Sequence, residues 1–197
     1  MRGVCCVGSP SSRVESKCAL LSLTVLWPLQ SGQWILCKNR LVPQPPVRRA
    51  NVADIPELLR LRGVMFGGMG IDTANAEWTV STVRILERHL PSSTIVAAVV
   101  DRTLEPGICA AGLLQIQEGL GSPRFPKGLR GHVSSVAVDP EWRRRGLGED
   151  ILRFLLNEAR TLGLERVELH ATPDGERIYR KLGFHDRPVG VELQLDL

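Results

Sequence analysis

Hydrophobic and polar positions alternate with recognisable periods from about residue 54 onward. Four stretches place apolar residues at roughly helical spacing, which predicts helices over 54–66, 77–89, 146–162 and 174–182. Five stretches are rich in β-branched residues or alternate with period two, which predicts strands over 94–100, 108–117, 132–138, 166–171 and 191–197. The expected order is ααβββαβαβ, an α/β or α+β layered fold around one sheet.

Turn residues separate these elements. Asp54 followed by Glu57 is a capping-box pattern for the first helix, and Gly67-Gly68-Met69-Gly70 is expected to end that helix. Gly and Pro residues within 119–130 predict an exposed loop between two antiparallel strands.

The first 46 residues lack this periodicity. Their apolar run, Ala19 to Trp27, is short, is ended by Pro28 and is followed by no small-x-small cleavage pattern, so a secretory signal is disfavoured. Pro43-Gln44-Pro45-Pro46 is typical of an extended linker. We expect residues 1–46 to be a disordered or dispensable extension and residues 47–197 to form the domain.

Charge and cysteine are distributed unevenly between these two parts. The formal net charge is +4. Residues 1–46 hold five basic and one acidic side chain, whereas residues 47–197 hold twenty of each. The domain therefore has no net field to attract a polyanion, and no nucleic-acid partner is expected.

Cys109 is the one cysteine of residues 47–197, which predicts neither a disulfide framework nor a structural metal site there. It lies in an apolar strand and is expected to serve packing. A reduced, cytoplasmic location fits this usage. No apolar run approaches the roughly 20 residues of a membrane span, so no membrane association is expected.

The strongest chemical signal follows the strand that ends at Val138. Arg143-Arg144-Arg145-Gly146-Leu147-Gly148 connects this strand to a helix. Glycines let the backbone approach phosphates closely, a helix N-terminus offers free N–H groups, and arginines add charge-assisted bonds. The segment thus suits a pyrophosphate. A dinucleotide-binding Gly-x-Gly-x-x-Gly is the alternative, but position 151 is Ile and seven residues separate Val138 from Gly146.

The segment resembles the acyl-CoA-binding motif of the GNAT superfamily of N-acetyltransferases, Gln/Arg-x-x-Gly-x-Gly/Ala, through Arg143, Gly146 and Gly148. Tyr179 with Gly183-Phe184 resembles the family's second signature, Tyr-x-x-x-Gly-Phe. The resemblance covers roughly residues 47–197. It implies a mixed, mostly antiparallel sheet flanked by helices, acetyl-CoA as cosubstrate without a metal, and a primary amine as acceptor. It leaves a homodimer open.

The resemblance also assigns roles. The residues implied to bind acetyl-CoA are Val136, Ala137, Val138, Arg143, Arg144, Arg145, Gly146, Leu147, Gly148 and Glu149. Backbone groups of Val136 and Val138 would bind the pantetheine and thioester, and an N–H there would stabilise the oxyanion. Tyr179, the one tyrosine of the chain, would protonate the departing thiolate.

The general base is less defined. Many family members place a glutamate on the strand before the loop, but here that stretch is His132-Val133-Ser134-Ser135. Glu118 and His132 are the candidates, acting directly or through water. His170 either lines the cleft or is a core histidine. The missing carboxylate keeps a second interpretation open, a non-catalytic acyl-CoA-binding or regulatory module. The acceptor is not specified by the sequence, and residues 66–78 and 119–130 are expected to surround it.

Overall fold

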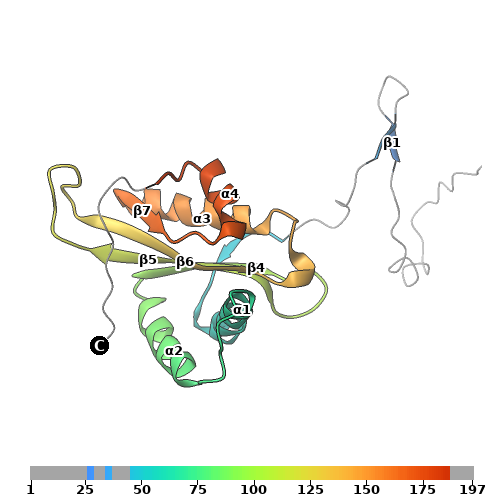
Figure 1. Ribbon diagram of the computed structural model, residues 1–197, viewed down its shortest axis with the longest axis horizontal. Helices are drawn as coiled ribbons and strands as arrows, with labels where there is room; N and C mark the ends of the chain where they lie inside the picture. Colours follow the sequence, from blue (N-terminus) through green and yellow to red (C-terminus); the bar gives the residue numbers. More distant parts are fainter. Residues whose placement is uncertain (1–25, 29–33, 37–44, 187–197) are drawn as a thin grey trace, which may run out of the picture. The chain divides into compact units, whose positions relative to one another are not determined.

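The computed structural model describes residues 26–28, 34–36 and 45–186 (Figure 1). By its internal contacts the chain divides into two units between Pro43 and Gln44. In the first unit, β1 (Leu26–Pro28) pairs antiparallel with β2 (Trp34–Leu36). The sequence pattern had not predicted these two short strands. The second unit carries the predicted motifs.

A five-stranded sheet with the order β3-β4-β5-β6-β7 forms the centre of the second unit. Its strands are β3 (Arg48–Arg49), β4 (Ile95–Asp101), β5 (Ile108–Glu118), β6 (Leu129–Val138) and β7 (Arg166–Leu169). The first three neighbouring pairs are antiparallel and β6 pairs parallel with β7. This mixed, mostly antiparallel sheet confirms the predicted fold class.

Helices cover both faces of the sheet. α1 (Ile55–Gly68) and α2 (Glu77–His89) lie on one face, and α3 (Leu147–Thr161) and α4 (Pro173–Lys181) on the other (Figure 1). β4 is apolar at every position from Ile95 to Val100 because its side chains point alternately into the two cores. In this three-layer arrangement β6 lies between β5 and β7, and its C-terminal end leads into the connection to α3.

The predicted helices agree with the structure to within two residues at each end, but several details differ. β6 starts at Leu129, three residues earlier than expected, and β7 ends at Leu169, two residues earlier. The loop between β5 and β6 contains an isolated bridge between Ser122 and Phe125 and a hydrogen bond from the Gly119 N–H to the Gly128 carbonyl, 3.0 Å. β3 is too short to leave a periodic signal.

The capping box predicted at Asp54 and Glu57 is wrong. The box is formed one turn earlier, by Asn51 and Asp54, around the 3₁₀ turn Val52–Asp54. Asp54 makes no side-chain cap to α1 because its carboxylate accepts bonds from Arg48 and from the Asn51 N–H. Arg48 also bonds Asp101, which ties the short strand β3 to the end of β4.

The strand predicted at 191–197 lies outside the described residues. Within the described ranges, no helix combines the length and the apolar character required to cross a membrane.

These contacts define where the folded domain should begin. We expect a chain that starts at Val47 to retain the melting temperature of the full chain, because Val47 packs on the core and Arg48 keeps its ion pairs. A chain that starts at Asn51 loses β3 and both ion pairs, and should melt several degrees lower. Thermal unfolding followed by circular dichroism compares the three chains. A drop of several degrees for the Val47 chain would show that residues 1–46 stabilise the domain.

Candidate active site

Among the described residues, no strand pairs with the last residues of β6 on the side of β7, and we call this side the open edge of β6. β6 pairs with β7 only from Arg130 to Val133, although it continues alongside β5 as far as Val138. Between these two regions the β5–β6 register shifts, and Ser135 has a φ of 53°. An extra residue in one strand bends it and interrupts the ladder. The bulge at Ser135 therefore marks the point where β6 leaves β7.

Backbone alternation identifies which groups face this open edge. The Asp139 N–H donates to the Cys109 carbonyl, 2.9 Å, so Asp139 faces β5. Successive residues of a strand direct their N–H and C=O groups to opposite sides. Val138 and Val136 consequently face away from β5, toward the open edge. The Val138 carbonyl accepts a bond from Arg143 Nε, 3.2 Å.

A short loop links this edge to α3. It contains the 3₁₀ turn Pro140–Trp142 and two left-handed residues, Arg144 (φ 62°) and Gly146 (φ 88°). Gly146 is the N-cap of α3, and no side chain caps this helix. A Cβ built on Gly146 would meet no atom of the other described residues, its two chain neighbours aside, within 4 Å. The glycine thus keeps open space before the uncapped N–H groups of the first turn.

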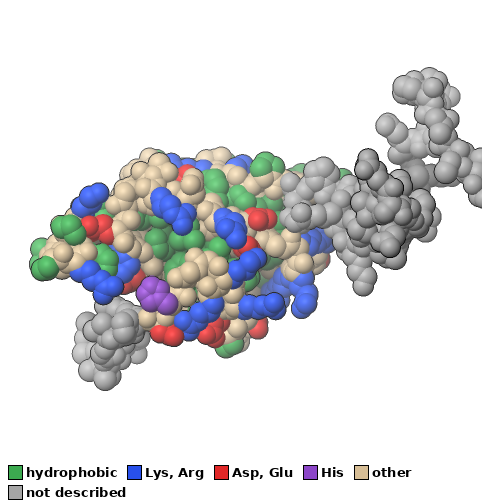
Figure 2. Space-filling view, turned by 90° about the horizontal axis from the view of Figure 1, so that it is seen from above, with side chains coloured by type: hydrophobic (Ala, Val, Ile, Leu, Met, Phe, Trp, Pro, Cys, Tyr) green, Lys and Arg blue, Asp and Glu red, His purple; other side chains and the backbone are tan. Residues whose placement is uncertain are grey.

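The three loop arginines differ in what holds them. Arg143 bonds the Val138 carbonyl, and Arg145 bonds the Glu141 carbonyl, 2.9 Å, with its guanidinium over the Trp142 ring. Arg144 makes no side-chain hydrogen bond to any described residue and is exposed. Seen from the side of α3 and α4, basic side chains are spread widely over the surface (Figure 2). Arg144 is the loop arginine available to an external anion.

Three other predicted cofactor residues have side chains that are buried or ion-paired within the domain. Ala137 and Leu147 are buried in the two cores. The Glu149 carboxylate bonds Lys181 Nζ, 2.7 Å, and Arg153 Nη2, 2.7 Å. These partners hold the pKa of Glu149 below its ordinary value. Glu149 thereby connects α3 to the end of α4.

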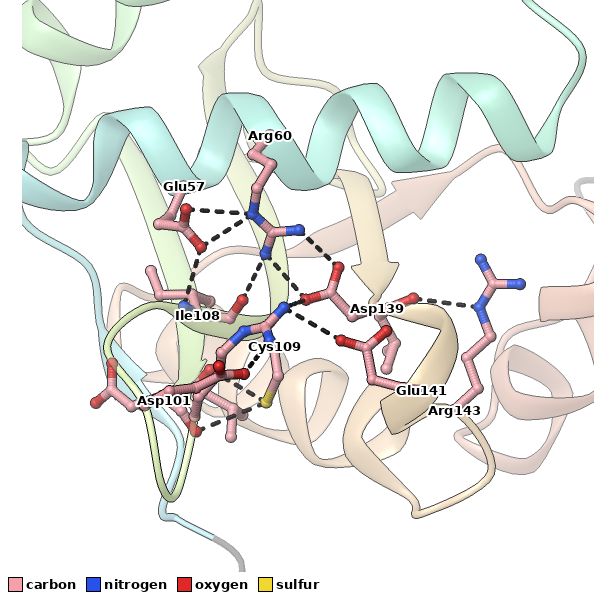
Figure 3. A network of polar contacts seen from close by, with 12 residues as sticks. Glu57, Arg60, Asp101, Ile108, Cys109, Asp139, Glu141 and Arg143 are labelled. Carbon is pink, nitrogen blue, oxygen red and sulfur yellow. Dashed lines mark hydrogen bonds and ion pairs between the residues drawn. The ribbon is translucent and has the colours of Figure 1, made fainter.

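A buried carboxylate fixes the start of the loop (Figure 3). Asp139 is 2% exposed and accepts two bonds from Arg60, at 2.7 and 2.9 Å, and one from Arg102. Arg60 comes from α1 and also bonds Glu57 and the Ile108 carbonyl. Arg102 follows β4 and reaches Glu141 at 3.3 Å. The end of β6 is therefore anchored to α1 and to the β4–β5 connection.

Tyr179 lies on α4, next to the start of α3. Its ring packs against Phe184 at a centroid distance of 6.0 Å and against Gly175, where a Cβ would come within 2.7 Å. The neighbouring Ile178 approaches the Gly148 position. The Tyr179 hydroxyl makes no hydrogen bond within the described part of the chain, and burial raises its pKa. Its ring is therefore held by packing, while its hydroxyl has no hydrogen-bond partner among the residues that the structure describes.

His132 lies on β6 three residues before the bulge at Ser135. It is half-buried, and its ring is 5.6 Å from the exposed ring of His170, which follows β7. Desolvation lowers the pKa of His132, a nearby positive charge on His170 lowers it further, and Glu168 opposes this. His170 is thus a partner of His132 at the end of the β6–β7 pairing, and its exposure rules out a core role.

Glu118 lies at the other end of the hairpin. It is exposed and pairs with Leu129, five residues before Ser134, about 17 Å at the rise of a strand. The structure brings together the open edge of β6, the loop and Tyr179 but does not bring Glu118 to them. Cys109 is fully buried, and burial raises its pKa to about 11, which fits packing and not nucleophilic chemistry.

One residue at the site gave no signal in the sequence. Arg62 of α1 donates a hydrogen bond to the Ser135 hydroxyl at the β6 bulge. Its guanidinium lies over Phe66, 4.9 Å from the ring centroid, and Phe66 contacts Trp78 edge to face at 5.5 Å. Phe66 and Trp78 bound the 66–78 segment expected near the acceptor.

The model of the acetyltransferase (GNAT) family matches residues 70–184, more than half of the chain. The chain therefore belongs to the GNAT family of acetyltransferases. This confirms the family predicted from the two motifs, and the matched region contains the open edge of β6, the loop and α4.

Individual relatives cover less of the chain. Glucosamine 6-phosphate N-acetyltransferase 1 of Oryza sativa is 41% identical over 66 residues, 34% of this chain and 40% of the relative. Glucosamine 6-phosphate N-acetyltransferase of Trypanosoma brucei is 36% identical over 75 residues, 36% of this chain and 51% of the relative. The chain thus spans about half or less of the length of these two curated relatives.

Solved structures match over a greater length. A predicted acetyltransferase of Clostridium acetobutylicum, solved with acetyl-CoA, aligns with a TM-score of 0.68 at 22% identity, covering 75% of this chain and 94% of its own. Glucosamine-6-phosphate N-acetyltransferase of Arabidopsis thaliana aligns with a TM-score of 0.60 at 20% identity, covering 76% and 97%. At these identities the likeness establishes the fold.

Proposed function

We propose that this chain transfers the acetyl group of acetyl-CoA to a primary amine. The observation that carries the proposal is the open edge of β6, which runs directly into a glycine-containing loop and an uncapped helix. One continuous stretch, Val136 to Glu149, then offers backbone donors to an extended ligand that ends in a pyrophosphate. Family membership supports this assignment, because the two motifs of the family fall on this stretch and on α4.

The residues present suit acetyl-CoA. A pyrophosphate would meet the free N–H groups and the positive dipole end of α3, with room provided by Gly146 and charge by Arg144. The pantetheine arm would lie along the open edge and accept bonds from the Val136 and Val138 N–H groups. Arg143 and Arg145 support the ligand indirectly, by holding the loop in shape.

The thioester supplies an activated acetyl group, and the chain supplies the proton transfers. In the proposed reaction, Tyr179 donates a proton to the departing thiolate. Its raised pKa keeps the phenol protonated at neutral pH, and its free hydroxyl can turn toward the sulfur. The Val136 N–H, on the open edge, stabilises the negative charge on the acetyl oxygen.

His132 is our choice for the base. Its lowered pKa leaves the imidazole neutral at pH 7, as a proton acceptor must be. It lies at the end of the β6–β7 pairing, next to the edge where the thioester would sit. Glu118 remains a candidate only through a chain of waters, given its distance along the hairpin.

The proposed acceptor is a primary amine, and its identity is not specified further by the site. The two curated relatives act, by their names, on glucosamine 6-phosphate. An amino sugar phosphate is therefore one acceptor to test. The absence of a carboxylate on β6 favours the alternative, a non-catalytic acyl-CoA-binding module. The next experiment distinguishes this module from an enzyme.

Tyr179→Phe removes the hydroxyl and keeps the packing ring. We expect folding and acetyl-CoA affinity to be nearly unchanged and kcat to fall by roughly 100-fold or more at neutral pH, because the proton is needed in the transition state. The deficit should shrink as pH rises and free thiolate becomes an acceptable leaving group, since an ordinary thiol has a pKa of about 8.5.

Thiol release with a panel of primary amines measures this for both proteins. A Tyr179→Phe protein with wild-type kcat would assign the ring to packing alone. Acetyl-CoA binding by the wild-type chain without turnover on any amine would support the binding module instead.

His132→Asn removes the proposed base. At neutral pH we expect kcat/KM to fall by roughly 100-fold. The sign of the pH effect follows from the lowered pKa: wild-type His132 is neutral above its folded pKa, which lies below the ordinary 6.5, and is protonated as pH falls through it. Wild type and variant should therefore converge in kcat/KM at low pH. His89→Asn, on α2 where His89 bonds Thr94, is the matched control and should behave as wild type. Parallel profiles that never converge would remove His132 from proton transfer.

A further inference from the structure

Arg62 differs from Arg48 and Arg60, two other partly buried arginines of the domain. Arg48 pairs with Asp54 and Asp101, and Arg60 pairs with Asp139 and Glu57. In both cases the carboxylates raise the pKa of the arginine. Arg62 forms no ion pair within the described residues, and desolvation lowers its pKa. A guanidinium taken out of water without a counter-ion is costly, so the missing partner requires an explanation.

The donor groups of Arg62 are only partly used. One terminal nitrogen donates to the Ser135 hydroxyl, and Phe66 covers one face of the guanidinium. Nε is shielded from solvent and has no hydrogen-bond partner among the described residues. A guanidinium presents five N–H donors in a planar fork that matches a carboxylate or phosphate. The second terminal nitrogen makes no hydrogen bond to a described residue, so the guanidinium keeps donors for such a group without displacing a protein partner.

Ser135 places this guanidinium beside the reaction site. It is the bulge residue of β6, and it directly precedes Val136, whose N–H faces the open edge proposed for the thioester. Consecutive Cα atoms are 3.8 Å apart, so an anion held by Arg62 lies within the span of a small molecule whose amine reaches the acetyl group.

We propose that Arg62 binds an anionic group of the acceptor, so that the acceptor is a small amine that also carries a carboxylate or a phosphate. This rests on the proposed acetyl transfer and narrows its substrate class. Arg62 supplies the charge, the Ser135 hydroxyl fixes the position of the guanidinium, and the Phe66 and Trp78 rings form an apolar wall beside it. The acetyl group that is transferred and the roles of Tyr179 and His132 in proton transfer stay as proposed above.

Paired acceptors test this charge requirement. Glucosamine 6-phosphate and glucosamine differ by a phosphate, and glycine and glycinamide differ by a carboxylate negative charge. We expect wild type to prefer the anionic member of one pair by about 10–100-fold in kcat/KM, the range expected for a hydrogen bond to a charged group. The pair that shows the preference identifies the source of the anion.

Arg62→Gln should remove that preference by lowering kcat/KM for the anionic acceptor about 10–100-fold, with less than about a threefold change for its neutral analogue. Arg62→Lys keeps the charge but not the fork, and should retain part of the preference. Arg84→Gln, an exposed arginine on α2, is the matched control and should leave the preference intact. Ser135→Ala keeps the guanidinium charge but removes the hydrogen bond that positions it, and should weaken the preference less than Arg62→Gln does.

Thermal unfolding gives a readout that needs no acceptor. Arg62→Gln removes a partly buried charge that has no ion pair among the described residues, so its melting temperature should equal or exceed that of wild type. A large loss of stability, or equal losses of kcat/KM on anionic and neutral acceptors, would make Arg62 a structural support of the β6 bulge and overturn the inference. Turnover of both members of each pair at equal rates by wild type would overturn it too, while leaving acetyl transfer established. Absence of turnover on every amine would count against the transfer reaction itself, and the inference would fall with it.

Discussion

Asp139 is the fixed point on which the site depends. Its carboxylate is buried at the junction of β6 and the following loop, where Arg60 of α1 and Arg102 of the β4–β5 connection both donate to it. Removing Arg60 or Arg102 would leave the buried Asp139 carboxylate with too few partners, which is costly. The two arginines therefore hold α1, the β4–β5 connection and the end of β6 together at this point. The Asp139 N–H donates to β5, and backbone groups alternate along a strand, so the N–H groups of Val138 and Val136 face the open edge.

The open edge in turn arises from one residue. The bulge at Ser135 ends the pairing of β6 with β7 and leaves the last residues of β6 paired on one side only. Unpaired backbone donors inside a protein need partners, and an extended ligand satisfies them as a neighbouring strand would. The same bulge presents the Ser135 hydroxyl to Arg62. A single irregularity thus connects the proposed acetyl-CoA site on one side with the proposed acceptor site on the other.

Local patterns were sufficient to predict the parts of the site that are contiguous in sequence. The arginines and glycines from Arg143 to Gly148, and Tyr179 with Gly183-Phe184, carry their signal in their spacing. Arg62 and Ser135 carry none, because an arginine on the polar side of a helix and a serine in a strand are ordinary until tertiary packing brings them together. Asp139 gives no signal of its own in the sequence, because its role depends on two arginines that are 79 and 37 residues away. Glu118 is a candidate because it ends the strand that precedes β6, but the hairpin places it beside the start of β6, far from the loop that follows Val138.

The open edge of β6 is tested most directly by amide hydrogen exchange, detected by NMR, with and without acetyl-CoA. Val136 and Val138 on the edge, and Gly148 and Glu149 in the first turn of α3, should exchange readily in the free protein and become protected when acetyl-CoA binds. Ala137, which faces β5, should be protected in both states and serves as the internal reference. Protection confined to other parts of the domain, with these four amides unchanged, would contradict the assignment of β6 and its loop as the site of acetyl-CoA.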